Sequence, residues 1–291
     1  MRNFGITLIA AALLSSCAAV DLRTDLIKNS PNDSETKGRE LLTDAVQKMG
    51  YDKLSETQTY SVTANFDWAS FWRLMPMNTF PGNHNNDLEF KFATNSFDGQ
   101  MTYLEGRKEG LTQGLQSWQG YKIKRNTGAL KQHEHDRYIW GLATYHYLLE
   151  APYRILTECD VIRYGGQKVI NGKTYETVYT TWQTEEPNKE FDRWLLYIDP
   201  DTGFIDLMEI TINDFFIAMP KGLQHATVWV DRAPTSIGAQ LPTNVTIQLM
   251  SPKSPDKKVY SFALRDYKFD NFDKQELYPI EGLPYYGTSK N

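Results

Sequence analysis

The sequence is poor in cysteine and has no excess of basic charge. Its 291 residues include two cysteines, Cys17 and Cys159, and this count excludes a framework of disulfides. The net charge is −5, from 31 basic and 36 acidic residues, whereas nucleic-acid binding usually requires a basic stripe. We therefore expect no nucleic-acid partner. Hydrophobic residues at 41% and charged residues at 23% are typical of a globular protein rather than a disordered one.

Motifs for catalysis and phosphate binding are missing as well. No Gly-x-Ser-x-Gly elbow occurs. The stretch GGQKVINGKT resembles a phosphate loop, but Gln167 stands where the pattern needs glycine, and strand patterns flank it on both sides. Asp199, Asp201 and Asp206 lack the spacing and the glycine of an EF-hand and fit a turn. We expect no catalytic residue and no cofactor, and therefore a protein that is not an enzyme.

One polar stretch, KQHEHDRYIW, contains four residues of metal-ligand type: His133, Glu134, His135 and Asp136. The zinc motif HExxH needs histidines four apart, and these are two apart. On a strand both histidines would share a face, but neither His84 nor His225 can be assigned as a third ligand. The simpler interpretation is a solvated loop in which Asp136 caps the following helix. We expect no metal, and a metal-dependent hydrolase is kept as an alternative.

The N-terminal apolar run is short. It extends from Gly5 to Leu14, about ten residues, whereas a bilayer core requires roughly 20. With Arg2 before it, this run is typical of a secretory signal peptide. The residues at its end, LSSC, resemble the lipobox of bacterial lipoproteins. The alternatives are an ordinary signal peptide with an incidental cysteine, or a short membrane anchor.

The lipobox resemblance implies cleavage before Cys17. Diacylglycerol with palmitate-type chains would be attached to the sulfur, and a third acyl chain can cap the new amino group. Several acyl chains give stable anchoring because each buried methylene contributes ~0.8 kcal/mol. Ala18, in place of the aspartate that retains enteric lipoproteins at the inner membrane, suggests the outer membrane. We therefore expect a lipid-anchored protein of the cell envelope.

The mature chain is expected to have two parts. After the signal peptide, 1–16, residues 17–37 are rich in turn formers and polar residues and predict a lipidated flexible tether, with a reach of ~25 Å. Residues 38–291 are expected to form a single domain. In its first segment, 38–56, apolar residues at helical spacing predict a helix that Gly50 can end.

The rest of the domain has the pattern of an antiparallel sheet. Apolar residues alternate with polar ones in TYSVTANFDW and NDLEFKFAT. Asn171-Gly172 and the sequence DPDTG predict hairpin turns. About ten strands follow in the serial order of a meander. One segment, 136–156, has no period of two and is apolar nearly all round, which predicts a buried helix that ends at Pro152 and acts as a lid or plug.

The order of these features resembles a group of lipoproteins of Bacteroidetes-type bacteria. The motifs are APYRIL after the apolar helix, INGKTYETVYTTW, and DRWLLYIDPDTGFI. They are similar to the LolA/LolB-like lipoprotein-carrier half-barrel superfamily over roughly residues 38–270. The resemblance implies a mainly β (α+β) fold: an open antiparallel half-barrel with an N-terminal helix and a lid helix. It also implies binding of acyl chains or another apolar ligand between sheet and lid. The lipid anchor makes the chain more similar to the receptor type, or to a distinct binding protein, than to the soluble carrier.

Aromatic and leucine side chains are the remaining candidates for a ligand site. We predict that eight of them line the cavity, although each could equally belong to an ordinary core: Tyr60, Phe66, Trp68, Phe90, Trp140, Tyr145, Leu149 and Trp194. Cys159 is expected to be a buried, inert thiol. The predicted function is an anchored lipoprotein that binds lipid, with transfer of lipid or lipoprotein left open. A tethered scaffold without ligand is the alternative of another class, and the oligomeric state is not predicted.

Overall fold

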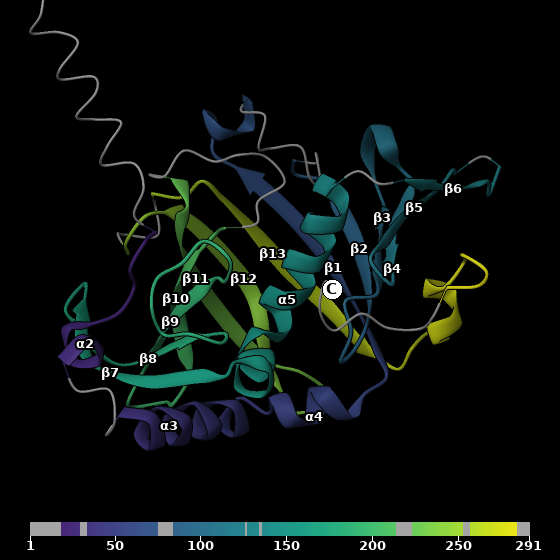
Figure 1. Cartoon of the computed structure of the whole chain (residues 1–291). Helices are drawn as coiled ribbons and strands as arrows, with labels where there is room; N and C mark the ends of the chain where they lie inside the picture. The colour runs from purple at the N-terminus through teal and green to yellow at the C-terminus, as the bar shows by residue number, and fades with distance from the viewer. Residues whose placement is uncertain are drawn as a thin grey trace, which may run out of the picture.

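The computed structural model describes residues 19–29, 34–74, 84–125, 127–133, 136–213, 223–252 and 257–283. Within these ranges, thirteen strands form one antiparallel sheet that curves around a long helix (Figure 1). The predicted open half-barrel is confirmed, with more strands than the ten expected. The strands are β1 (Thr59–Trp68), β2 (Asp87–Ala93), β3 (Gly99–Tyr103), β4 (Thr112–Gln116), β5 (Gln119–Ile123), β6 (Leu130–His133), β7 (Val161–Ile170), β8 (Lys173–Thr181), β9 (Arg193–Ile198), β10 (Ile205–Thr211), β11 (His225–Pro234), β12 (Gln240–Leu249) and β13 (Tyr260–Phe269).

The sheet consists of two meanders joined in the middle. Its order is β6-β5-β4-β3-β2-β1-β13-β12-β11-β10-β9-β8-β7, so β1 and β13 form the one junction between strands distant in sequence. In that junction Phe66 lies opposite Phe262 and Trp68 opposite Tyr260. The strands β6 and β7, consecutive in the sequence, lie at opposite edges of the sheet. The segment that connects them must therefore cross a whole face.

That connection is α5 (Asp136–Glu158), 23 residues long. It begins where the sequence predicted a helix, but the prediction that Pro152 stops it is wrong, because α5 continues for six residues beyond. A proline removes one backbone donor and usually bends a helix. Here ion pairs from Glu150 to Arg154 and the buried Ile155 hold the last two turns on the domain. The side chain of Asp136, the predicted cap, lies outside the described residues.

Two further helices precede the sheet. α3 (Ser34–Lys48) and α4 (Tyr51–Glu56) replace the single helix predicted over 38–56. The break occurs at Gly50, whose φ of 69° is left-handed, as a helix-ending glycine requires. A side chain there would also lie 3.0 Å from the carbonyl oxygen of Gly238. No described helix is long and apolar enough to cross a membrane.

Residues 20–29 differ most from the sequence prediction of a flexible tether. They lie on the outer face of the sheet, where α2 (Asp25–Asn29) contacts β7. Leu22 and Ile27 are 6% and 1% exposed, within a second apolar cluster that includes Tyr179 and Tyr197. Two apolar side chains in a polar sequence suffice to pack this stretch against the sheet. The folded domain also begins earlier than residue 38, since α3 starts at Ser34.

Candidate functional site

The concave face of the sheet is covered by α5, and the main core lies between them (Figure 1). Side chains from nearly every strand face this interface, because alternate residues of each strand point to the same side. On β9, for example, Trp194, Leu196 and Ile198 join this core, whereas Leu195 and Tyr197 join the outer cluster. From α5 the interface receives Leu142, Tyr145, Leu148, Leu149, Ala151 and Ile155, all buried.

Seven of the eight predicted cavity residues meet in this core. They are Tyr60, Phe66 and Trp68 of β1, Phe90 of β2, Trp194 of β9, and Tyr145 and Leu149 of α5. The eighth, Trp140, is half-buried near the start of α5 and is not part of this cluster. Their role as ligand contacts stays a prediction. Cys17, predicted to carry the lipid, lies outside the described residues.

Tyr145 forms the centre of the contact between helix and sheet. Its ring centroid lies 5.1 Å from Phe66, 5.4 Å from Phe262 and 6.0 Å from Phe90. The first two are edge-to-face contacts, the geometry that aromatic quadrupoles favour. Burial raises the pKa of Tyr145 well above its ordinary value, so the phenol stays neutral. The helix therefore fills the concave face with its own aromatic side chains.

A buried ionic cluster lies one turn further along α5. His146, Glu150 and Arg154 are spaced four residues apart and lie on one stripe of the helix. The His146 Nε2 is 2.8 Å from one Glu150 oxygen, and the Arg154 Nε is 2.7 Å from the other. Their side chains are 0%, 4% and 2% exposed. Charged groups are almost never buried to this extent unless they are paired, and here each charge has its partner.

This cluster also attaches α5 to the sheet. The Arg154 guanidinium donates a hydrogen bond to the carbonyl oxygen of Ser96, in the turn between β2 and β3, and lies 4.4 Å from the Phe97 ring centroid. The His146 ring stacks on Phe92 with centroids 4.1 Å apart. The C-terminal half of α5 is thus held by charge and ring contacts, whereas residues 137–140 at its start are only half-buried.

The charge state of the cluster follows from its surroundings. Burial alone raises the pKa of Glu150, but His146 and Arg154 outweigh it and bring that pKa below its ordinary value. Burial lowers the pKa of His146, although Glu150 opposes the effect. Glu150 and Arg154 are therefore charged and His146 is neutral near pH 7. Nε2 then carries the proton toward Glu150, and Nδ1 has no hydrogen-bond partner.

Several polar atoms under α5 are likewise buried without a partner. Among the described side chains of the core, these include the indole N–H groups of Trp68 and Trp194 and the hydroxyl of Tyr147. The Tyr147 and Trp194 rings are neighbours, with centroids 5.4 Å apart. Native proteins satisfy most buried donors, and each exception needs an explanation. These groups can donate to the oxygen of a polar head or ester between helix and sheet.

The metal hypothesis receives no support from the described histidines. No group of three metal-ligating side chains occurs among the described residues. His133 ends β6 at one edge of the sheet, His84 accepts a hydrogen bond from the Trp68 backbone, and His225 lies beside Glu209 on β10. Glu134 and His135 lie outside the described residues. Cys159 is buried at 6% exposure, and burial raises the pKa of its thiol, in keeping with the inert role predicted for it.

Sequence reasoning identified aromatic side chains that the structure brings together but missed the ionic cluster. The signal was present, because His146, Glu150 and Arg154 recur every four residues within an otherwise apolar helix. Such a stripe could have been recognised as a set of side chains that pair with one another in a buried helix. Ser96, which accepts from Arg154 through its backbone, leaves no sequence signal at all.

Comparisons with known proteins are informative only at the level of structure. No protein-family model matches the sequence, and no curated protein matches it. A putative outer membrane lipoprotein-sorting protein domain from Vibrio parahaemolyticus is similar, with a TM-score of 0.50 and 8% identity over 84% of this chain and 97% of that chain. A DUF1329 family protein from Desulfovibrio piger gives 0.48 and 8%, over 86% and 99% of the two chains. A LolA superfamily protein from Nitrosomonas europaea gives 0.47 and 10%, over 84% and 97%. This chain, an open antiparallel sheet curved around a helix, therefore shares its fold with the Vibrio parahaemolyticus domain.

Proposed function

We propose that the protein is a lipid-anchored lipoprotein of the cell envelope, in the outer membrane, that binds an acyl chain or another apolar ligand between its sheet and α5. The lipobox at Cys17 supports the anchor, and the half-barrel fold supports the ligand class. A role in the transfer of lipid or lipoprotein is consistent with this arrangement. No catalytic step is part of the proposal.

One observation carries the proposal. The concave face under α5 is apolar, yet it contains hydrogen-bond donors that have no partner among the described residues. An ordinary core would have little reason to bury the N–H groups of Trp68 and Trp194 without acceptors. A lipid has both an apolar chain for the aromatic floor and carbonyl oxygens for these donors. Ligand sites are mostly apolar with a few polar groups that fix orientation, which is the composition found here.

Ligand binding requires α5 to move. The space between sheet and helix is occupied by α5 side chains such as Tyr145 and Leu149, and an acyl chain would have to replace them. The half-buried start of the helix, 137–140, can leave the sheet at lower cost than the part held by Glu150 and Arg154. The ligand then favours a minor conformation in which the helix is displaced, and its affinity is reduced by the cost of populating that state.

The first test is native mass spectrometry of the full-length protein extracted from membranes. A bound lipid of defined mass, lost on denaturation, is expected.

The second test is titration of the purified protein with a fluorescent fatty acid. Tyr145→Ala should increase the binding of this probe, because it loosens the lid and enlarges the floor. Tyr175→Ala is the matched control. Tyr175 is 5% exposed, against 3% for Tyr145, but it lies in the outer cluster. Absence of lipid and of probe binding in both proteins would disprove the ligand function.

A second candidate function is a tethered scaffold that takes no ligand. The dense aromatic packing of Tyr145 against Phe66, Phe90 and Phe262 favours it, because the concave face is filled as it stands. For a scaffold, amide hydrogen exchange in α5 should be as slow as in the central strands. For a lipid-binding protein with a lid, exchange should be faster at the start of α5 and should slow when the fatty acid is added.

A further inference from the structure

The N-terminal segment is fixed to the outer face of the sheet beside the β7–β8 hairpin (Figure 1). Leu22 is buried in the outer apolar cluster. Arg23 lies 3.1 Å from Asp21 and 2.6 Å from Glu186 in the loop after β8, so its charge is paired within the segment and with the sheet. Residues 20–29 are therefore held against the sheet.

This segment forms one wall of a pocket of about 450 Å³. The volume falls within the range of ligand pockets. Its floor includes Glu209, which lies 2.8 Å from His225 and accepts a hydrogen bond from the Tyr197 hydroxyl. The rest of the lining mixes the apolar Val169, Ile170, Leu195 and Pro252 with the polar Lys168 and Ser251. The lining thus mixes charged, polar and apolar side chains, as is needed at the boundary between headgroups and acyl chains.

The distance from this pocket to the lipid anchor is short. Three peptide links separate Cys17 from Val20. Consecutive Cα atoms are 3.8 Å apart, so the two residues are at most ~11 Å apart. The pocket wall at Val20 must then lie close to the bilayer surface. This step rests on the lipid anchor of the proposed function, but not on ligand binding under α5.

The same end of the molecule exposes large apolar side chains. Val169, near the tip of the β7–β8 hairpin, is 65% exposed, and Met250, beside the pocket residues Ser251 and Pro252, is 49% exposed. Leu26 of α2 is 39% exposed above Gly166 of β7. Lys168, next to Val169, lines the pocket and has its amine 5.9 Å from the Tyr197 ring centroid.

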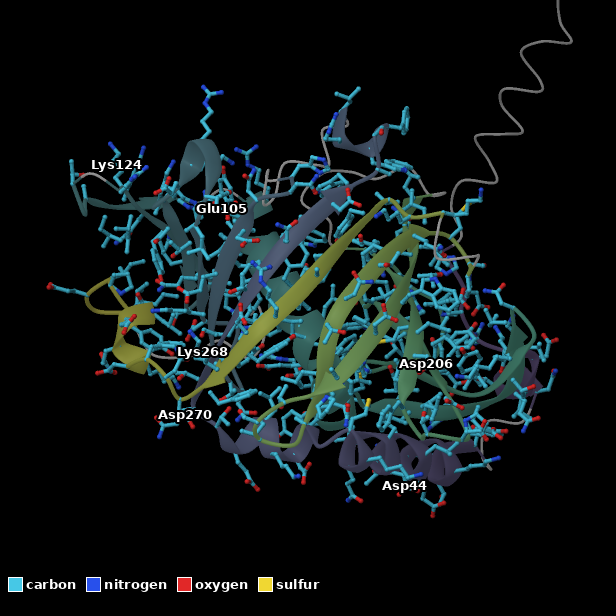
Figure 2. All side chains as sticks on the ribbon, turned by 180° about the vertical axis from the view of Figure 1, so that it is seen from behind. Asp44, Glu105, Lys124, Asp206, Lys268 and Asp270 are labelled. Atoms are coloured by element: carbon cyan, nitrogen blue, oxygen red, sulfur yellow. The ribbon has the colours of Figure 1, made fainter. Side chains whose placement is uncertain are left out.

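We propose that the β7–β8 end, with Val169, Met250 and the pocket between them, is the surface that lies on the bilayer, and that its partner is the lipid interface. The opposite end, at β5 and β6, then points away from the membrane. Lys124 marks that end in Figure 2, on the other side of the molecule from Asp206 of β10. The rigid attachment of residues 20–29 fixes this orientation, which a flexible tether would leave free.

The test uses the full-length lipidated protein purified from membranes and reconstituted in phosphatidylethanolamine–phosphatidylglycerol vesicles. In a Cys159→Ala background, a fluorophore is attached at Val169→Cys or at Leu130→Cys. Leu130 is a matched control, because it is apolar, 41% exposed and located in β6 at the far edge. Lipid-borne nitroxides should quench the fluorophore at position 169 several-fold more than that at position 130. Equal quenching at both positions, or stronger quenching at 130, would overturn the proposal.

A second variant tests the contact itself. With the fluorophore at Met250→Cys, Val169→Asp should reduce quenching several-fold, whereas Leu130→Asp should leave it unchanged. Unchanged quenching in the Val169→Asp protein would contradict a contact through this hairpin. The intact mass, measured before labelling, separates the two ideas. A mass without acyl chains rejects the anchor of the proposed function, whereas a lipidated protein without quenching at position 169 rejects the orientation alone.

Discussion

The carboxylate of Glu150 lies 2.7 Å from the Arg154 guanidinium, one turn apart on α5 and almost fully buried. This pair lies within a helix that otherwise contacts the sheet through apolar side chains, so it carries much of the polar attachment of the lid. Buried pairs are costly to form, and their removal leaves an uncompensated charge. The pair is therefore the first point at which the attachment of α5 can be tested.

Arg154→Met should destabilise the protein by about 3–5 kcal/mol, because Glu150 would stay buried without its counter-charge. Urea denaturation followed by circular dichroism measures this change. The matched control is Arg163→Met on β7, where the arginine lies 2.8 Å from Glu35 and 3.0 Å from Glu185 but in a more exposed setting. That variant should lose about 0–1 kcal/mol. A similar loss in both variants would mean that the buried pair has no special role.

Acidification should weaken the folded state through His146. Burial holds its pKa below the unfolded value of about 6.5, so the unfolded chain binds more protons once the pH falls beneath that value. Stability is then complete above pH ~6.5 and declines below it. Glu150, whose folded pKa is also lowered, adds a further loss only below pH ~4.3. Burial raises the folded pKa values of Asp98 and Glu158, so these two carboxyls oppose the effect of the histidine as the pH falls, and urea midpoints at pH 7.5 and 5.5 report their sum.

The matched variants for this pH effect are His146→Phe and His84→Phe. The first should have a smaller difference between the two midpoints than the unmodified protein. The second, at a side chain that is 27% exposed, should keep the full difference. If His146→Phe leaves the pH dependence intact, another group is responsible for it.

Trp194→Phe tests the unpaired donor under α5. The substitution keeps the aromatic packing and removes an N–H group that has no partner in the protein. Stability should change little, whereas affinity for the fluorescent fatty acid should fall by about 1 kcal/mol, roughly fivefold, if the ligand accepts this hydrogen bond. Trp229→Phe is a suitable comparison, because that indole already donates to Gln248, 3.0 Å away. Equal affinities for Trp194→Phe and unmodified protein would remove the donor from the ligand site.

Cys17→Ser tests the anchor. The serine cannot accept diacylglycerol, so the protein should leave the membrane fraction or accumulate unprocessed. Fractionation and immunoblotting measure both outcomes, and Cys159→Ser, which changes only the buried thiol, should stay in the membrane fraction. A Cys17→Ser protein that is processed and anchored as before would contradict lipidation.

The sequence predicted those strands in which one face is buried and the other is exposed to solvent. In β1, five apolar residues alternate with polar ones, and all five face the main core: Tyr60, Val62, Ala64, Phe66 and Trp68. The turn between β4 and β5 has no such signal in the sequence. Ser117 and Trp118 both have positive φ there, at 47° and 63°, although neither is a residue that usually adopts it. Asp98 stabilises this turn by accepting from the Ser117 N–H, which is a tertiary effect.

The candidate site was predictable in its residue types but not in its contacts. Alternation identified Phe66, Phe90 and Tyr145 as buried, yet it could not indicate that Phe262, almost 200 residues further along the chain, completes the same cluster. That meeting depends on the pairing of β1 with β13, which closes the two meanders. The docking of residues 20–29 was missed for a related reason, since Leu22 and Ile27 find their partners only on the finished sheet.

The path of α5 also limits the shape that the sheet can take. The helix joins β6 to β7, the two edges of the half-barrel, and its 23 residues span about 35 Å when helical. As long as it stays helical, the edges cannot separate much further than this length and its short connections allow. The sheet therefore cannot flatten without limit, and ligands above a certain width are excluded. The length of α5 therefore sets the greatest width of the concave face. It also sets an upper limit on the width of a ligand bound between sheet and helix.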